Sequence, residues 1–125
     1  MPLTWTIDHE TKMAITVVTG DITRADMDAM LSAMEQAGAA PYRKLFDAGR
    51  GTNAMAPDDM MALGWRLRST QGDGPMGPLA LVFPLAMMEA VSRVIGMLAV
   101  AERPMKVFTD ASEARRWLEK QAVPD

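Results

Sequence analysis

The sequence predicts an α/β fold with a mainly parallel sheet, and three observations lead to this prediction. Short segments rich in β-branched residues alternate with longer segments whose apolar residues recur every three or four positions. These segments follow one another in the order ββαβαβαβα, and strand–helix–strand units form right-handed parallel crossovers. The first two strands are separated only by the polar turn HET, which favours an antiparallel hairpin at the edge of the sheet. We therefore expect a small α/β sandwich with helices packed on its sheet.

The N-terminal segment predicts this hairpin and a first helix. WTID and KMAITVVTG are its two strands, because β-branched residues recur throughout them. Thr23 and Asp26 have the spacing of a capping box, and Gly38 and Pro41 end the helix that begins there. The apolar face of this helix consists of Met27, Met30, Leu31 and Met34.

The rest of the chain predicts three further strands, each followed by a helix. RKLFD is a short apolar strand, and the helix after it begins near Pro57, which suits a first helical position. The turn-rich stretch QGDGPMGP leads into the buried strand LALVF and then a helix over residues 85–100. MKVFT is the last strand, and Asp110 with Glu113 predicts a second capping box. The closing helix carries Ala114, Trp117 and Leu118 on its apolar face.

Composition predicts a single domain over residues 1–125 and excludes several classes of function. The chain has no Cys, which removes disulfides, thiolate nucleophiles and Cys-based zinc sites, and suits the cytoplasm. A formal net charge of −3 gives no general attraction to nucleic acid. The most apolar stretch contains Glu89 and Arg93, so we expect no transmembrane segment, and the N-terminus shows no secretory leader.

A glycine pattern follows the strand RKLFD and resembles a dinucleotide-binding turn. Gly49, Gly51 and Ala54 have the spacing G-x-G-x-x-A. The helix begins only near Pro57, beyond this pattern, and Asp58 and Asp59 already occupy its positive end, where they would repel a phosphate. We therefore reject the nucleotide interpretation and expect no cofactor.

The order and spacing of several segments resemble another family. These segments are the turn Gly20-Asp21-Ile22-Thr23, the strand KLFDA, the helix start APDDMMALG and the C-terminal KVFTDASEARRWLE. Together they resemble the STAS domain of anti-sigma-factor antagonists and, more closely, the small SpoIIAA-like family of STAS-like proteins. This family is similar in fold to the lipid-carrying CRAL-TRIO domains. The resemblance implies a STAS-like sandwich that binds a partner rather than catalysing a reaction.

The resemblance also implies where a partner binds, and one difference limits how binding is regulated. Regulatory STAS proteins carry a phosphorylated Ser at the start of the helix after this loop, but here Ala56 and Pro57 occupy the equivalent positions. Asp58 follows directly, and it either supplies a permanent negative charge in place of the phosphate or caps the helix. The implied surface for a regulatory protein partner consists of Asp47, Gly49, Gly51, Thr52, Asn53, Met55, Asp58 and Asp59.

No residue set predicts catalysis or a metal site. The sole His9 lies in the expected hairpin turn between Asp8 and Glu10, and adjacent residues on a strand point to opposite faces, so these three would not converge on a metal. Asp47 follows a strand at the edge where α/β sheets bind ligands, but a lone carboxylate is not a mechanism. Its other interpretation is a hydrogen bond to backbone N–H groups of the loop. We expect a non-enzymatic protein.

The segment over residues 85–100 is apolar around more of its circumference than one sheet-facing stripe requires. A second subunit, an apolar ligand or a partner protein could cover the remainder. We rank a homodimer first, because isologous dimers are common among small soluble domains. A lipid or other apolar small molecule in a Met-rich pocket is the alternative. The residues of this expected surface are Met87, Met88, Val91, Val94, Ile95 and Leu98.

Overall fold

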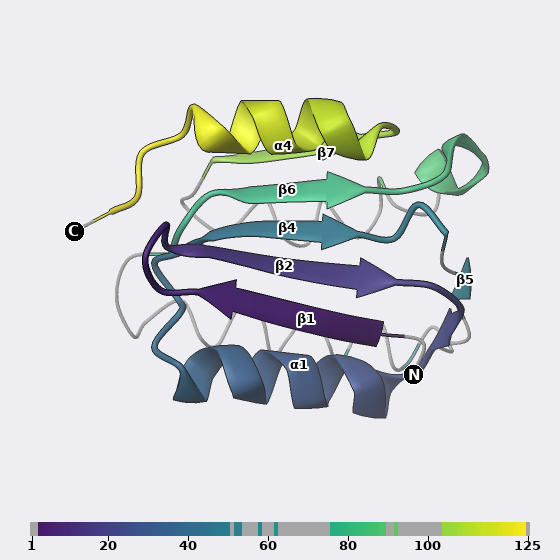
Figure 1. Cartoon of the computed structure of the whole chain (residues 1–125). Coiled ribbons are helices and arrows are strands. Elements are labelled where there is room, and N and C mark those ends of the chain that lie inside the picture. Colours follow the sequence, from purple (N-terminus) through teal and green to yellow (C-terminus); the bar gives the residue numbers. More distant parts are fainter. Residues whose placement is uncertain are drawn as a thin grey trace.

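The computed structural model describes residues 3–50, 52–53, 58, 62, 76–89, 92 and 104–124. Its main feature is a five-stranded sheet with the order β1-β2-β4-β6-β7 (Figure 1). The strands are β1 (Leu3–Asp8), β2 (Met13–Val18), β4 (Arg43–Asp47), β6 (Leu79–Val82) and β7 (Met105–Phe108). The fold is thus a mixed α/β fold, as the alternation of strands and helices predicted.

The expected hairpin and parallel crossovers are both present. β1 pairs with β2 antiparallel from Leu3 opposite Val18 to Asp8 opposite Met13, without a break in register. β2, β4, β6 and β7 pair in parallel. One antiparallel strand therefore extends an otherwise parallel sheet, and the N-terminal edge is where the sequence placed it.

A second, two-stranded sheet was not predicted. β3 (Asp21–Ile22) and β5 (Thr52–Asn53) pair in parallel, with Asp21 opposite Thr52 and Ile22 opposite Asn53. Both lie just beyond the carboxyl ends of the main strands (Figure 1). The sequence suggested turns at both places, because a pair of two residues is too short to show alternation. The pairing of β3 with β5 joins the segment after β2 to the loop after β4.

Helix α1 (Arg24–Gln36) has the predicted start and end. The Thr23 hydroxyl accepts a hydrogen bond from the N–H of Asp26, and the Asp26 carboxylate accepts one from the N–H of Thr23. The helix ends before Gly38, whose φ of +68° is a left-handed conformation that glycine adopts without strain. Met27, Met30 and Met34 are buried and Leu31 is half-buried, which confirms the predicted apolar face.

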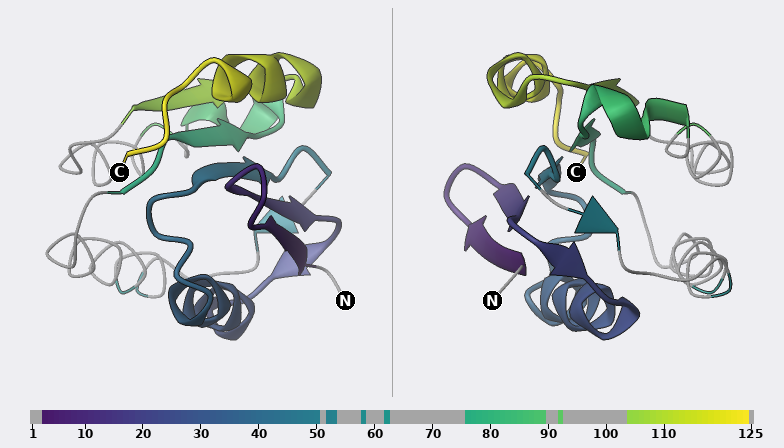
Figure 2. Two further views of the ribbon diagram at one scale, coloured as in Figure 1. Left: turned by 60° about the vertical axis from the view of Figure 1, so that its left-hand side comes forward. Right: turned by 90° about the vertical axis from the view of Figure 1, so that its right-hand side faces the viewer.

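Helix α4 (Ala111–Glu119) is the C-terminal helix and lies on the face of the sheet opposite to α1 (Figure 2). The carboxylate of Asp110 accepts hydrogen bonds from the N–H groups of Ser112 and Glu113. Glu113 does not return a bond to the Asp110 backbone, so the predicted capping box is only half formed. Ala114 and Leu118 are fully buried, as expected from their spacing.

The two helices divide the core into two layers. On one face, α1 packs with a cluster that includes Leu3, Ala14 and Val18. On the other face, α4 packs with a cluster that includes Leu45, Ala80 and Val82. Met13 and Ala14 are adjacent in sequence yet belong to opposite clusters, because successive side chains of a strand point to opposite faces.

The two remaining predicted helices fall largely outside the described residues. Asp58 and Ala62 are helical, in agreement with the helix expected from Pro57. The segment expected as a helix over residues 85–100 begins as the 3-10 turn η2 (Leu85–Met87), and Met88, Glu89 and Ser92 are helical.

Candidate functional site

The candidate site lies at the carboxyl edge of the parallel strands. β2, β4, β6 and β7 run in one direction, so the segments that follow them gather at one edge of the sheet (Figure 1). In open α/β sheets this is the edge at which ligands bind. The loop after β4 and the turn after β6 are the segments that bear on the predicted partner surface.

Asp47 is the last residue of β4 and shapes the loop that follows. Its Oδ1 accepts a hydrogen bond from the N–H of Gly49 at 3.1 Å. This is the loop-stabilising role that was one of the two sequence interpretations of Asp47. Its carboxylate is half-buried, so it is partly open to solvent. The bond holds the start of the loop in a tight turn.

The loop is also tied to the neighbouring strand β6. The N–H of Ala48 donates to the carbonyl of Val82 at 2.8 Å, and Ala48 is buried. A Cβ built on Gly49 would lie 3.3 Å from Oδ1 of Asp47, closer than most real Cβ contacts, and 3.7 Å from Cγ1 of Val82. The small residue therefore lets the backbone approach both groups.

The far part of the loop contains β5, which is held by its pairing with β3. The backbones of Thr52 and Asn53 pair with Asp21 and Ile22 of β3, so the loop is fixed by strand pairing at Val82 on one side and at β3 on the other. Gly49 and Arg50 lie between these two anchors and are exposed. Asp58 is also exposed and lies in a helix. Gly51, Met55 and Asp59 of the predicted surface lie outside the described residues.

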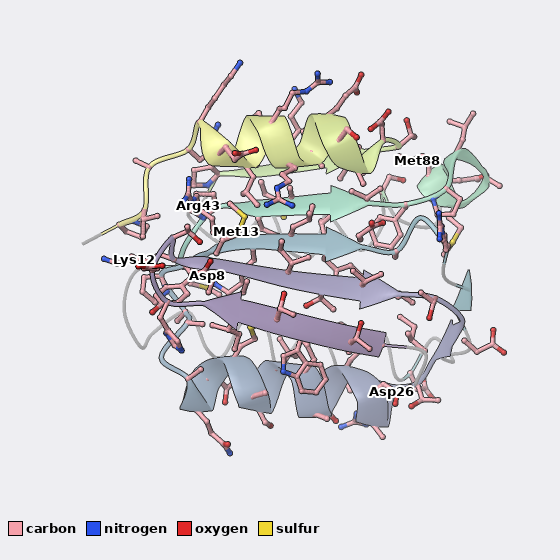
Figure 3. The ribbon with its side chains drawn as sticks, viewed as in Figure 1. Asp8, Lys12, Met13, Asp26, Arg43 and Met88 are labelled. Atoms are coloured by element: carbon pink, nitrogen blue, oxygen red, sulfur yellow. The ribbon has the colours of Figure 1, made fainter. Side chains whose placement is uncertain are left out.

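An exposed apolar side chain lies at the same edge. Leu85 is the first residue of η2, three positions after β6 ends, and the residue is 78% exposed. No other large hydrophobic residue in the described part of the chain is exposed. Met87 and Met88 beside it are half-buried, and Figure 3 shows Met88 at this end of the sheet. Val91, Val94, Ile95 and Leu98 lie outside the described residues.

The sequence placed Leu85 at the start of the apolar segment over residues 85–100 but did not predict which of its side chains would be exposed. Leu85 follows Pro84, which has extended backbone angles and begins the η2 turn. Its exposure depends on which elements pack nearby, and helical periodicity does not encode this.

The opposite end of the strands carries polar groups that form hydrogen bonds within the fold. Figure 3 shows Asp8, Lys12 and Arg43 at this end, far from Met88. The guanidinium of Arg43 donates to the carbonyl of Thr11 at 2.7 Å and to that of Glu119 at 3.2 Å. Its Nε is buried and, in the described structure, has no partner. Arg43 thus links the hairpin turn to the end of α4.

His9 lies in the hairpin turn, as predicted, and Asp8 is the last residue of β1 beside it. Nδ1 of His9 lies 2.7 Å from the Tyr42 hydroxyl, and the two rings meet edge to face. Hydrogen bonds from the N–H groups of Thr11 and Glu10 hold the pKa of the Asp8 carboxyl below its ordinary value of 3.8. Among the described residues, no three His, Asp or Glu side chains gather closely enough to hold a metal ion.

Comparison with known proteins identifies relatives of the fold. A family model described as SpoIIAA-like matches residues 13–119. A crystal structure of an uncharacterised protein with a SpoIIAA-like fold from Shewanella loihica PV-4 is 18% identical and covers 93% of each chain, with a TM-score of 0.63. No curated protein matches. None of the described helices is long and apolar enough to cross a membrane.

Proposed function

This chain belongs to the SpoIIAA-like family, whose model covers residues 13–119, and from this premise we propose that it is a non-enzymatic binding or regulatory domain. The proposed domain acts in the cytoplasm as a homodimer and recognises a protein partner through the loop and helix start at residues 47–59. We extend this surface to η2 and define the carboxyl-edge surface as Asp47, Gly49, Arg50, Asp58 and Leu85.

The exposure of Leu85 is the observation that carries the proposal. A single exposed apolar side chain is common on any protein surface, but this one follows the strand whose carbonyl at Val82 holds the loop. Apolar anchors surrounded by polar groups are typical of protein interfaces. Arg50 and Asp58 supply exposed charges of both signs on the same chain segment. Such a combination favours a protein partner over a purely apolar ligand.

A second feature supports this choice of surface. The loop is held at Gly49 by Asp47 and at Thr52 by pairing with β3, so these described parts of its backbone are fixed before a partner arrives. A preordered surface loses less conformational entropy on binding. Asp58 contributes either a permanent negative charge to the interface or only a favourable interaction with its own helix dipole.

Affinity capture with paired variants tests the proposal. The wild-type protein and the variants Leu85→Ser, Arg50→Glu and Asp58→Ala are immobilised and exposed to extract from the cells that produce the protein, and retained proteins are quantified. We expect one partner whose capture falls about tenfold or more with Leu85→Ser and Arg50→Glu, because each removes an interface anchor. Glu10→Ala and Glu35→Ala change exposed residues elsewhere and should leave capture unchanged.

The outcomes separate the alternatives. A partner that is retained equally by all carboxyl-edge variants would place recognition elsewhere and contradict the proposal. If the partner is lost with Leu85→Ser but still captured by Asp58→Ala, Asp58 serves only to cap its helix. Native mass spectrometry of freshly purified protein tests the alternative function, since a co-purified acyl chain or other apolar molecule would favour a carrier with a Met-rich pocket.

A further inference from the structure

The outer edge of β1 is the longest open strand edge in the described structure. β1 ends the main sheet and pairs through all six of its residues with β2. In an antiparallel pair, alternate residues point their N–H and C=O groups away from the partner strand. None of the described strands lies beyond β1 (Figures 1 and 2). A row of backbone donors and acceptors therefore faces outward, and only another extended segment can satisfy it fully.

The opposite edge strand, β7, is protected in ways that β1 is not. β7 has four residues against six in β1, and the ammonium group of the exposed Lys106 lies 5.3 Å from the centre of the Phe108 ring. A short strand and a Lys on it both discourage pairing between sheet edges. A helix packs on the face of each edge strand, α4 on β7 and α1 on β1, so the helices do not distinguish the two edges. The shortness of β7 and its Lys106 do distinguish them.

β1 lacks these protective features. From Leu3 to Ile7 it contains no charged residue, no Pro and no bulge, because its register with β2 is continuous. Thr4 and Thr6 are exposed, so the surface beside the edge is polar but uncharged. Its only charge, Asp8, is at the end of the strand, where it already accepts bonds from the hairpin turn. Such an edge permits pairing with another chain.

The alternation of side chains makes β1 complementary to itself. A two-fold axis perpendicular to the sheet pairs two copies antiparallel and keeps each face of the sheet continuous, so residues of like position share a face. With the axis at Trp5, Thr4 lies opposite Thr6 of the second copy and Leu3 lies opposite Ile7 of the second copy. Threonine pairs and aromatic pairs across strands are favourable, and this register brings no like charges together.

The sheet face beside this edge also favours pairing with a second copy of the chain. Ile15 and Val17 of β2 lie on the face that α4 covers elsewhere, next to Thr6 and Thr4 of β1. α4 packs against β4, β6 and β7, and Ile15 and Val17 are half-buried. In the paired sheet these side chains would flank the two-fold axis, where the second copy reduces their exposure.

We propose that two copies of this chain form a homodimer by antiparallel pairing of β1 with β1 about a two-fold axis at Trp5. The inference rests on the homodimeric state proposed above, but it assigns the interface to β1 rather than to residues 87–98. It does not depend on the carboxyl-edge surface, so a failed partner experiment leaves it intact. A failed dimer experiment likewise does not bear on the carboxyl-edge surface, which the partner experiment tests separately.

A charge-pair variant tests the interface. In Thr4→Lys/Thr6→Lys, two pairs of like charges face each other across the axis, so we expect the dimer Kd in sedimentation equilibrium to rise by about tenfold or more. Both positions are exposed, so the monomer should fold normally by circular dichroism. Gln36→Lys/Thr109→Lys adds the same charge at two exposed positions outside β1 and should leave the dimer unchanged.

Cysteine crosslinking tests the register. The natural chain has no Cys, so each introduced thiol is the only one in its chain. A mixture of Thr4→Cys and Thr6→Cys should form a disulfide-linked heterodimer under mild oxidation, whereas either variant alone should crosslink far less. The directly opposite position brings the two Cβ atoms within the range of a disulfide.

Three results would overturn the inference. One is a wild-type protein that stays monomeric at all accessible concentrations. Another is a dimer whose Kd is the same in Thr4→Lys/Thr6→Lys and in the control variant. The third is efficient crosslinking of Thr4→Cys or Thr6→Cys with itself, since this would move the two-fold axis away from Trp5.

Discussion

Gly77 occupies the tightest place among the described glycines. It is buried beside the turn that leads into β4, and its N–H donates to the carbonyl of Ala40 at 2.9 Å. A Cβ at this position would overlap the carbonyl oxygens of Tyr42 and Pro41. Both are backbone atoms, which cannot move aside as a flexible side chain can. The residue is therefore required for space rather than for an unusual φ.

Gly77→Ala is expected to lower the free energy of unfolding by about 3 kcal/mol or more, because the added methyl group overpacks a backbone contact. Urea denaturation followed by circular dichroism measures the loss. Gly38→Ala is the matched control, since its Cβ would meet nothing within 4 Å and only the φ of +68° is unfavourable. Its cost should be about 1 to 2 kcal/mol. An equal loss in both variants would contradict the steric explanation.

The β1–β2 hairpin depends at its turn on one carboxylate. Asp8 accepts hydrogen bonds from the N–H groups of Glu10 at 2.9 Å and Thr11 at 3.2 Å. Lys12 completes the turn with a φ of 54°. The ionised carboxylate is a stronger hydrogen-bond acceptor than the protonated carboxyl, so the two bonds favour the charged form and lower the pKa of Asp8 in the folded chain.

The pKa of Asp8 predicts how the hairpin turn responds to acid. Because the pKa is below 3.8 in the folded state, the stabilising contribution is complete above 3.8 and is lost as pH falls through the lowered pKa. NMR titration of the Asp8 carboxyl carbon should give a midpoint below 3.8. The amide shifts of Glu10 and Thr11 should change over the same range.

Asp8→Asn is the control for this titration, since an amide does not ionise in this range. The shifts of Glu10 and Thr11 should then no longer follow pH at that midpoint. A midpoint for Asp8 at or above 3.8 would contradict the role of the two N–H groups.

The two core layers share one sheet, so we expect the described fold to unfold as a single cooperative unit. Trp5 packs in the layer under α1, whereas Trp117 packs in the layer under α4. The strands β2, β4 and β6 contribute alternate side chains to the two faces. Loss of packing on one face therefore weakens the strands that support the other.

Leu118→Ala tests this cooperativity. Leu118 is fully buried, so its truncation should cost about 2 to 5 kcal/mol. Fluorescence of variants that retain only Trp5 or only Trp117 should show the same reduced denaturation midpoint. Leu85→Ala, at a residue that is 78% exposed, should change the free energy of unfolding by about 0.5 kcal/mol or less. Separate midpoints for the two tryptophans would show that the layers unfold independently.

Local signals in the sequence determined much of this molecule. Asp26 three residues after Thr23 was sufficient to predict the start of α1, because a capping box is formed by neighbouring residues. The strand at Arg43–Asp47 was predicted with the same limits, since a short apolar run followed by glycines is a short-range pattern. The rejection of a nucleotide site and the identification of the loop after Asp47 rested on equally local evidence.

The tertiary structure decided what depends on residues far apart in the chain. The pairing of β3 with β5 joins segments about thirty residues apart, and it involves too few residues to leave a periodic pattern. The exposure of Leu85 and the open edge of β1 depend on which elements pack nearby, and periodicity does not encode this. Hydrogen bonds and side-chain alternation act between near neighbours, so sequence reveals them, whereas strand order and burial arise only when the whole chain packs.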